Sequence, residues 1–149
     1  MWIDGFNTVI TLEVLLSDSI LFACMDGTIR DLASLRGTYR IISETESAVR
    51  MLFDVLTDMK IRSATVLLDE PVSNSGRLKT LMADVGEEYS FDLDIQIQKD
   101  VDRALYSKEN VITSDSVILD HCSSWINLME KCMERLNRQG LRVCADTGN

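Results

Sequence analysis

Residues 65–69 read Thr65-Val66-Leu67-Leu68-Asp69, a short apolar run that ends in a carboxylate. The run lies between two segments whose apolar residues repeat at helical spacing, one ending near residue 60 and one beginning near residue 75. A strand that is covered on both faces of a parallel sheet is apolar at almost every position. The run therefore predicts a central parallel strand with helices on either side.

Segments on both sides of this run extend the same alternation of strands and helices. We expect strands at residues 1–4, 94–98 and 111–113, and helices at residues 8–16, 43–60, 75–85, 101–106 and from 123 to about 139. Regular alternation of this kind predicts one three-layer α/β/α domain over residues 1–149, with a mostly parallel central sheet. An Asp-Gly turn at Asp26-Gly27 adds a small β-hairpin insert at residues 20–30, and residues 141–144 are a candidate final strand.

Local signals define the predicted helix ends and faces. Ser43-Glu44-Thr45-Glu46 has the form of a capping box, and Ser75 is a candidate helix cap. For the last helix, an inner stripe is predicted at Trp125, Leu128, Met129, Cys132 and Leu136.

Composition limits the classes of protein to consider. The chain has 46% hydrophobic and 26% charged residues, no CxxC pair and one histidine, His121. These features disfavour a zinc site, and the cysteines are expected to be reduced thiols. No apolar run is long enough to span a bilayer and no signal peptide is evident, so we expect a cytoplasmic protein with no membrane partner. The net charge of −9 does not favour long-range attraction to nucleic acid.

Aspartates follow several of the predicted strands. Asp4, Asp69 and Asp115 come directly after a strand or shortly beyond it, and ligands in such sheets bind beyond the carboxyl ends of the strands. Carboxylates gathered there repel one another unless a cation or a shared proton is present, and Mg²⁺ or Mn²⁺ prefers oxygen ligands. Asp102 and Asp120 are further candidate ligands. Asp102 lies at a predicted helix start, where it or its neighbour Asp100 could equally be the helix cap. Asp120 could equally be a solvated residue.

The loop after Asp69 is a candidate anion site. It reads Val72-Ser73-Asn74-Ser75-Gly76-Arg77, and it precedes a predicted helix whose backbone amides favour a phosphate. Arg77 would clamp that phosphate, with Ser73 and Asn74 beside it and Arg40 as a weaker candidate. A tight loop with a capping serine accounts for the same residues equally well.

Two motifs resemble the PIN-like superfamily, and its NYN branch in particular. These are Ile3-Asp4-Gly5-Phe6-Asn7 and Val111-Ile112-Thr113-Ser114-Asp115-Ser116, and between them Lys99-Asp100-Val101-Asp102 resembles the Lys-x-Val-Asp segment of NYN proteins. The resemblance implies that Asp4, Asp102 and Asp115 bind a metal and that Asn7 orients the first of them. Many members of the superfamily are Mg²⁺- or Mn²⁺-dependent ribonucleases, which implies RNA as the substrate.

A closer resemblance covers most of the chain. Leu68-Asp69-Glu70-Pro71-Val72-Ser73-Asn74-Ser75-Gly76 is similar to the signature of an uncharacterised prokaryotic family. Members of that family carry another small domain on the N-terminal side, and the abrupt first strand leads us to expect a further segment before residue 1. The hairpin-containing insert at residues 20–40 departs from the usual PIN pattern.

Three functions remain open from the sequence. The first is a metal-dependent nuclease, in which the carboxylates Asp4, Asp69, Asp102 and Asp115 do the chemistry with Mg²⁺ or Mn²⁺. The second is a PIN-like binding or scaffold module without catalysis, which could be a homodimer. The third is a phosphatase that acts on a small nucleotide through the loop at residues 73–77.

Overall fold

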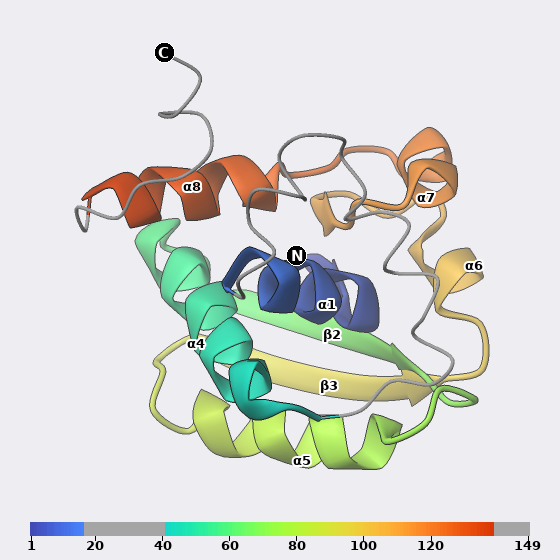
Figure 1. Cartoon of the computed structure of the whole chain (residues 1–149). Helices are drawn as coiled ribbons and strands as arrows, with labels where there is room; N and C mark the ends of the chain where they lie inside the picture. The colour runs from blue at the N-terminus through green and yellow to red at the C-terminus, as the bar shows by residue number, and fades with distance from the viewer. Residues whose placement is uncertain (17–40, 139–149) are drawn as a thin grey trace.

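The four described strands form a single parallel sheet. A computed structural model describes residues 1–16 and 41–138 of the chain (Figure 1). Its strands are β1 (Trp2–Asp4), β2 (Ser63–Asp69), β3 (Asp92–Gln98) and β4 (Val111–Ile112), and they lie in the order β3-β2-β1-β4, all parallel. The predicted α/β fold and its parallel sheet, with the run at residues 65–69 in an inner strand, are confirmed.

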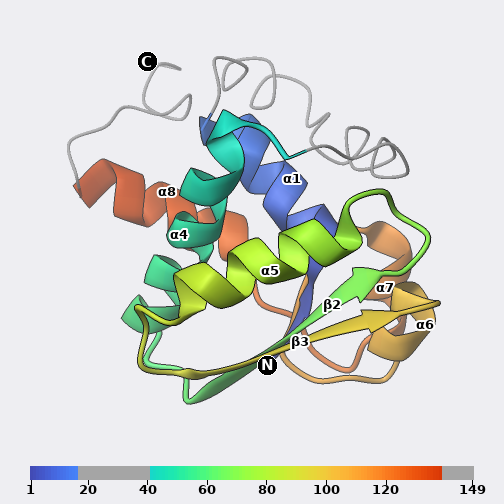
Figure 2. The same cartoon turned by 90° about the horizontal axis from the view of Figure 1, so that it is seen from below.

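Helices cover both faces of the sheet. Helices α1 (Gly5–Leu16), α4 (Ser43–Asp58), α5 (Ser75–Gly86) and α8 (Leu128–Arg138) pack on one face, whereas α6 (Val101–Leu105) and α7 (Ser116–His121) pack on the other (Figures 1 and 2). Val66 and Leu68 join the larger apolar core under the first group, and Leu67 joins the smaller core under the second. Because successive strand residues point to opposite faces, a continuous apolar run fills both cores.

Two helix starts differ from the prediction. Helix α1 begins at Gly5, directly after β1, where the sequence suggests a turn before residue 8. At α4 the predicted box of Ser43 and Glu46 is wrong, because the backbone amide of Ile42 donates to Thr45 Oγ1 (2.9 Å) and Ser43 Oγ donates to Glu44 (2.8 Å). The hydroxyl of Thr45 therefore accepts the free backbone amide at the start of the helix, in place of the predicted pair.

The starts of α5 and α8 also need correction. Asn74, not Ser75, is the N-cap of α5, and its φ of 65° is the left-handed conformation that asparagine tolerates well. Helix α8 starts at Leu128, later than predicted. The backbone of Trp125 pairs with Val111 beside β4, and the Trp125 side chain is 52% exposed. Leu128, Cys132 and Leu136 are buried as the predicted stripe requires. The hairpin and insert at residues 20–40, Arg40 and the strand at residues 141–144 lie outside the described residues.

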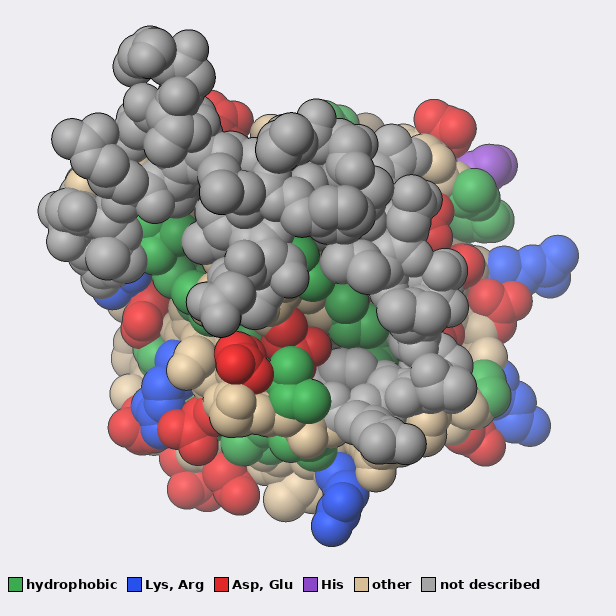
Figure 3. Space-filling view, in the orientation of Figure 1, with side chains coloured by type: hydrophobic (Ala, Val, Ile, Leu, Met, Phe, Trp, Pro, Cys, Tyr) green, Lys and Arg blue, Asp and Glu red, His purple; other side chains and the backbone are tan. Residues whose placement is uncertain are grey.

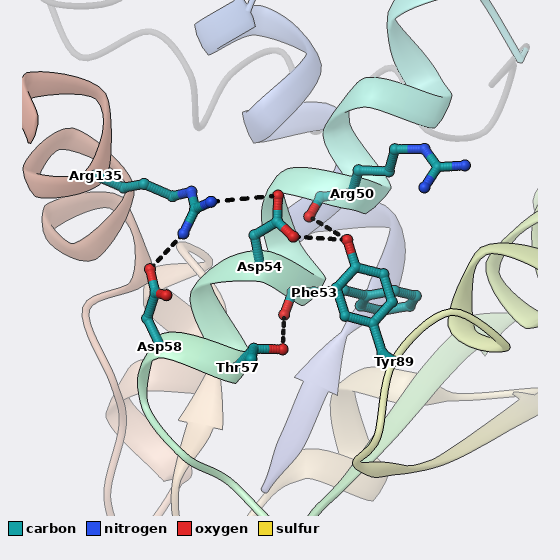
Figure 4. A network of polar contacts seen from close by, with 7 residues as sticks. All are labelled: Arg50, Phe53, Asp54, Thr57, Asp58, Tyr89 and Arg135. Atoms are coloured by element: carbon teal, nitrogen blue, oxygen red, sulfur yellow. Dashed lines mark hydrogen bonds and ion pairs between the residues drawn. The ribbon is translucent and has the colours of Figure 1, made fainter. Parts of the chain in front are cut away.

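A polar network joins α4 to α8 and to the turn before β3 (Figure 4). Arg135 contacts Asp58 (2.6 Å) and Asp54 (3.7 Å), and Tyr89 donates its hydroxyl to Asp54 Oδ1 (2.7 Å). The Tyr89 ring also packs edge-on against Phe53, with 5.4 Å between ring centroids. The network holds the ends of these elements around the larger core.

The titration of Tyr89 makes this network sensitive to alkaline pH. Burial, and then the hydrogen bond to Asp54, raise the pKa of Tyr89 from its ordinary value of 10.0 to about 12. The neutral phenol is thus favoured in the folded state, and its contribution to stability is present below about pH 10 and is lost as pH rises towards 12. Urea unfolding across this range should show a steeper loss of stability in the wild type than in Tyr89→Phe. Parallel curves for the two proteins would contradict the assignment.

Candidate functional site

The carboxyl ends of the strands meet at one rim of the sheet. Strand β1 ends at Asp4, β2 at Asp69 and β4 at Ile112, and all three run in the same direction. Asp4 pairs in register with Leu67, so Asp69 lies two residues further along the neighbouring strand. The rim therefore receives Asp4, Asp69 and the segment that begins at Thr113, as the sequence predicts.

One hydroxyl links Asp4 to the segment that carries Asp115. Thr113 Oγ1 donates to Asp4 Oδ2 (2.8 Å) and accepts the backbone amide of Asp115 (3.1 Å). Asp4 is fully buried, and Thr113 is 8% exposed. Two segments more than a hundred residues apart in the chain are thereby joined by a buried hydrogen bond.

Asn7 ties the same segment to the first helix. Its side-chain oxygen accepts the backbone amide of Ser114 (2.8 Å) and the Ser114 hydroxyl (3.1 Å), and Asn7 is itself buried. Asn7 lies in the first turn of α1, just after Asp4. The structure thus brings together Asp4, Asn7 and Asp115 through Thr113 and Ser114, two residues to which the sequence assigned no role.

Asp115 combines a capping function with partial exposure. It is the N-cap of α7, and its Oδ1 accepts the backbone amide of Val117 (2.9 Å). Asp120 lies on the same helix and is exposed. Capping thus explains part of the sequence signal at residue 115, while the position at the rim leaves the carboxylate half accessible.

Asp69 faces the start of α6. Its Oδ1 accepts the backbone amide of Val101 (3.3 Å), and Asp100 caps this helix by accepting the amide of Arg103 (3.1 Å). Asp102 lies half-buried in the first turn. Of the two aspartates that compete for the cap, Asp100 therefore takes it.

No complete metal-ligand cluster is formed by acidic, histidine or cysteine side chains. Within residues 1–16 and 41–138, no three such side chains lie close enough together to hold one ion. Ligation of a cation by Asp4, Asp102, Asp115 and Asp120 therefore stays a prediction. The rim does offer oxygen donors of the kind that Mg²⁺ and Mn²⁺ prefer.

The loop after β2 lies largely at the surface. Ser73 and Arg77 are exposed, and Asn74 is half-buried at the left-handed turn before α5. Arg77 borders a surface hollow together with Ile41 and Thr80. The roles of Ser73, Asn74 and Arg77 in phosphate binding stay predictions.

A cavity of about 260 Å³ opens beside the network. Asn7, Thr113 and Ser114 belong to its lining, together with Thr8 and Thr11 of α1 and residues between α7 and α8. The sequence signal for it is weak: two threonines follow Asn7 on a mostly apolar helix. This cavity is the feature that reasoning from the sequence missed.

The hydroxyl of Thr113 should be important for stability. Thr113→Val keeps the shape of the side chain but removes the donor to the buried Asp4 carboxylate and the acceptor for the Asp115 amide. We expect a loss of about 2–3 kcal/mol in the free energy of unfolding, measured by urea denaturation with circular dichroism. Thr113→Ser keeps the hydroxyl and should lose only about 1 kcal/mol, for the missing methyl group. Equal losses in the two variants would show that packing, and not the hydrogen bonds, explains the position.

The face seen in Figure 3 carries acidic side chains interspersed with Lys and Arg, and the basic side chains of the described residues form no continuous track on this face. No helix in the described part of the chain combines the length and apolarity needed to cross a bilayer.

Comparison with known proteins places the chain in a family. It is 31% identical over 141 residues to the "Uncharacterized protein MJ0935" of Methanocaldococcus jannaschii, an alignment that covers 93% of this chain and 67% of that protein. No solved structure matches the chain. A family model described as a domain of unknown function, DUF5616, matches residues 1–131. The match covers most of the chain, and the protein therefore belongs to the DUF5616 family.

Proposed function

We propose that this domain is a metal-dependent nuclease that hydrolyses phosphodiesters of RNA at the rim of the sheet. The observation that carries the proposal is the link from Asp4 to Asp115 through the Thr113 hydroxyl. The Asp4 carboxylate and the backbone of Asp115 are thereby held at one rim of a parallel sheet, where ligands of such folds bind. The resemblance of the motifs around Asp4 and Asp115 to PIN-like nucleases supports the same activity.

The donor set fits a hard divalent cation. Mg²⁺ is commonly held by one or two carboxylates, with water and substrate phosphate completing the shell. Asp4 and Asp115 would hold the ion, and Asp102 is the third carboxylate that the resemblance implies. A bound cation would neutralise the phosphate and lower the pKa of a coordinated water.

The residues around the carboxylates have positioning roles. Thr113 fixes the Asp4 carboxylate through its hydrogen bond, and Asn7 fixes the chain at Ser114, next to Asp115. Ligands held rigidly by such second contacts bind metal more tightly. Asp69, bonded to the amide of Val101, would position the start of α6, which carries Asp102.

An RNA cleavage assay tests the proposal. Purified protein is incubated with single-stranded and structured RNA in Mn²⁺, in Mg²⁺ or in chelator. We expect cleavage in the presence of the metal and its loss in chelator. An absence of chelator-sensitive cleavage across both substrates, for the full-length protein, would overturn the proposal.

The full burial of Asp4 favours a second candidate, a binding or scaffold module without catalysis. In that case the Asp4–Thr113 bond serves only to tie β1 to the segment after β4, and the acidic rim recognises a partner, including a second copy of the chain. Light scattering with size exclusion would then show a stable complex, and no RNA would be cleaved under any condition.

A further inference from the structure

The cavity beside the network is lined by both apolar and polar residues. The apolar ones are Leu12, Ile112, Leu119, Ile126, Leu128 and Met129. Polar residues come from α1, through Asn7, Thr8 and Thr11, and from the rim, through Thr113 and Ser114. A flat, mainly apolar ligand that also carries hydrogen-bonding atoms would match this mixed lining.

Thr8 supplies a hydroxyl that lacks a hydrogen-bond partner. The residue is 3% exposed and lines the cavity, and among the described residues no group bonds its Oγ1. By contrast, Thr11 Oγ1 donates to the carbonyl of Asn7 (2.7 Å), the usual partner of a helical threonine. A buried polar group is nearly always satisfied, so the Thr8 hydroxyl indicates a ligand atom that would complete it.

Trp125 is an aromatic residue in the lining of the cavity. Its backbone is fixed beside β4, since Val111 donates to Ser124 O (3.0 Å) and Ile126 donates to Val111 O (2.9 Å). Trp125 nevertheless lines the cavity and is 52% exposed. An exposed indole on a fixed backbone provides a stacking surface for a planar ring.

The size of the cavity suits one ring system. Pockets for drug-sized ligands span about 300–1,000 Å³, and this one is about 260 Å³. A single nucleobase has the required flat apolar faces and a polar edge. Because Asn7, Thr113 and Ser114 belong to both the cavity and the rim network, a base bound here would hold its phosphate next to Asp4 and Asp115.

We propose that this cavity is a nucleobase-binding site, in which the base stacks on Trp125 and bonds Thr8, and which presents the adjoining phosphodiester to the rim. This inference rests on the proposed nuclease function for its substrate, but base binding itself requires neither metal nor hydrolysis. It is therefore tested in chelator, where no cleavage can occur.

The test measures binding of the four common ribonucleoside monophosphates by NMR chemical-shift titration of the whole chain in chelator. We expect saturable shifts of Thr8, Thr11 and the Trp125 indole for at least one nucleotide. Trp125→Ala should weaken binding by about 5- to 100-fold, and Thr8→Val by about 5- to 10-fold. Thr80→Val is the matched control: its hydroxyl donates to Gly76 O on the exposed face of α5, away from the cavity, and binding should not change. Thr8→Val should fold as the wild type does, because it removes only an unpaired hydroxyl.

Several outcomes would overturn the inference. They are no saturable binding of any nucleotide, binding that both substitutions leave intact, and equal binding of planar aromatic compounds that lack a base's hydrogen-bonding edge. Cleavage of RNA without base binding would contradict the base-binding site but not the nuclease function. Base binding without cleavage would support the base-binding site and contradict the nuclease function.

Discussion

Gly5→Ala should lower the free energy of unfolding by about 3 kcal/mol. A Cβ at residue 5 would collide with Leu68 Cδ2 and would lie 2.8 Å from the carbonyl oxygen of Leu67 and 2.9 Å from Val66 Cγ1. The carbonyl belongs to an inner strand and cannot move without disturbing the sheet. Glycine at this position therefore lets α1 start directly on top of β2.

Gly76→Ala is the control for this prediction. It introduces the same change in the first turn of α5, where a Cβ would meet no atom within 4 Å. The protein should keep its stability or gain up to about 1 kcal/mol. Urea denaturation followed by circular dichroism measures both variants. A Gly5→Ala protein as stable as the wild type would show that α1 does not lie against β2 as closely as the structure has it.

The sheet was predictable because its signals are local. The apolar run at residues 65–68 needs no knowledge of its neighbours to be recognised as a doubly covered strand, and its flanking helices carry clear periodicity. The start of α1 was not predictable in this way. Gly5-Phe6-Asn7 has the composition of a turn, and only the proximity of β2 explains why glycine stands at a helix start there.

The errors at helix ends have a common physical cause. Ser43, Thr45 and Glu46 can each satisfy the start of α4, and the packing of the whole helix selects Thr45, which is buried and also bonds Glu13. Trp125 fits the helical stripe by its spacing, yet backbone bonds to Val111 hold it in an extended segment. Such tertiary competition cannot be read from a single segment.

The candidate site was also predictable from the sequence only in part. The rule that ligands bind at the carboxyl ends of parallel strands was sufficient to place Asp4 and Asp115 on one rim. The role of Thr113 depends on β1 and β4 being neighbours, which the sequence suggests but does not specify. The cavity requires α1 and the segment at residues 125–129 to be positioned together, and no local pattern encodes that arrangement.

Asp115→Asn should reduce hydrolysis of RNA by about 100-fold or more if the proposed function holds, because even the outer contacts of metal ligands are worth about 10- to 100-fold. The substitution removes the charge that would hold a cation, while asparagine retains an oxygen for the amide of Val117. Asparagine is as good an N-cap as aspartate, so α7 and the overall stability should be preserved. A loss of activity at unchanged stability would therefore report on chemistry and not on folding.

Asp100→Asn is the matched control, since Asp100 is the N-cap of α6 and accepts the amide of Arg103 in the same manner. It changes charge and cap identically but is exposed and outside the Asp4–Thr113–Asp115 network. The measurements are initial rates of RNA cleavage at saturating Mn²⁺ and an unfolding curve for each variant; only Asp115→Asn should lose activity. Equal rates for wild type and Asp115→Asn would show that Asp115 takes no part in the reaction. If that substitution instead altered only the oligomeric state, the binding or scaffold module would be the better account of the rim.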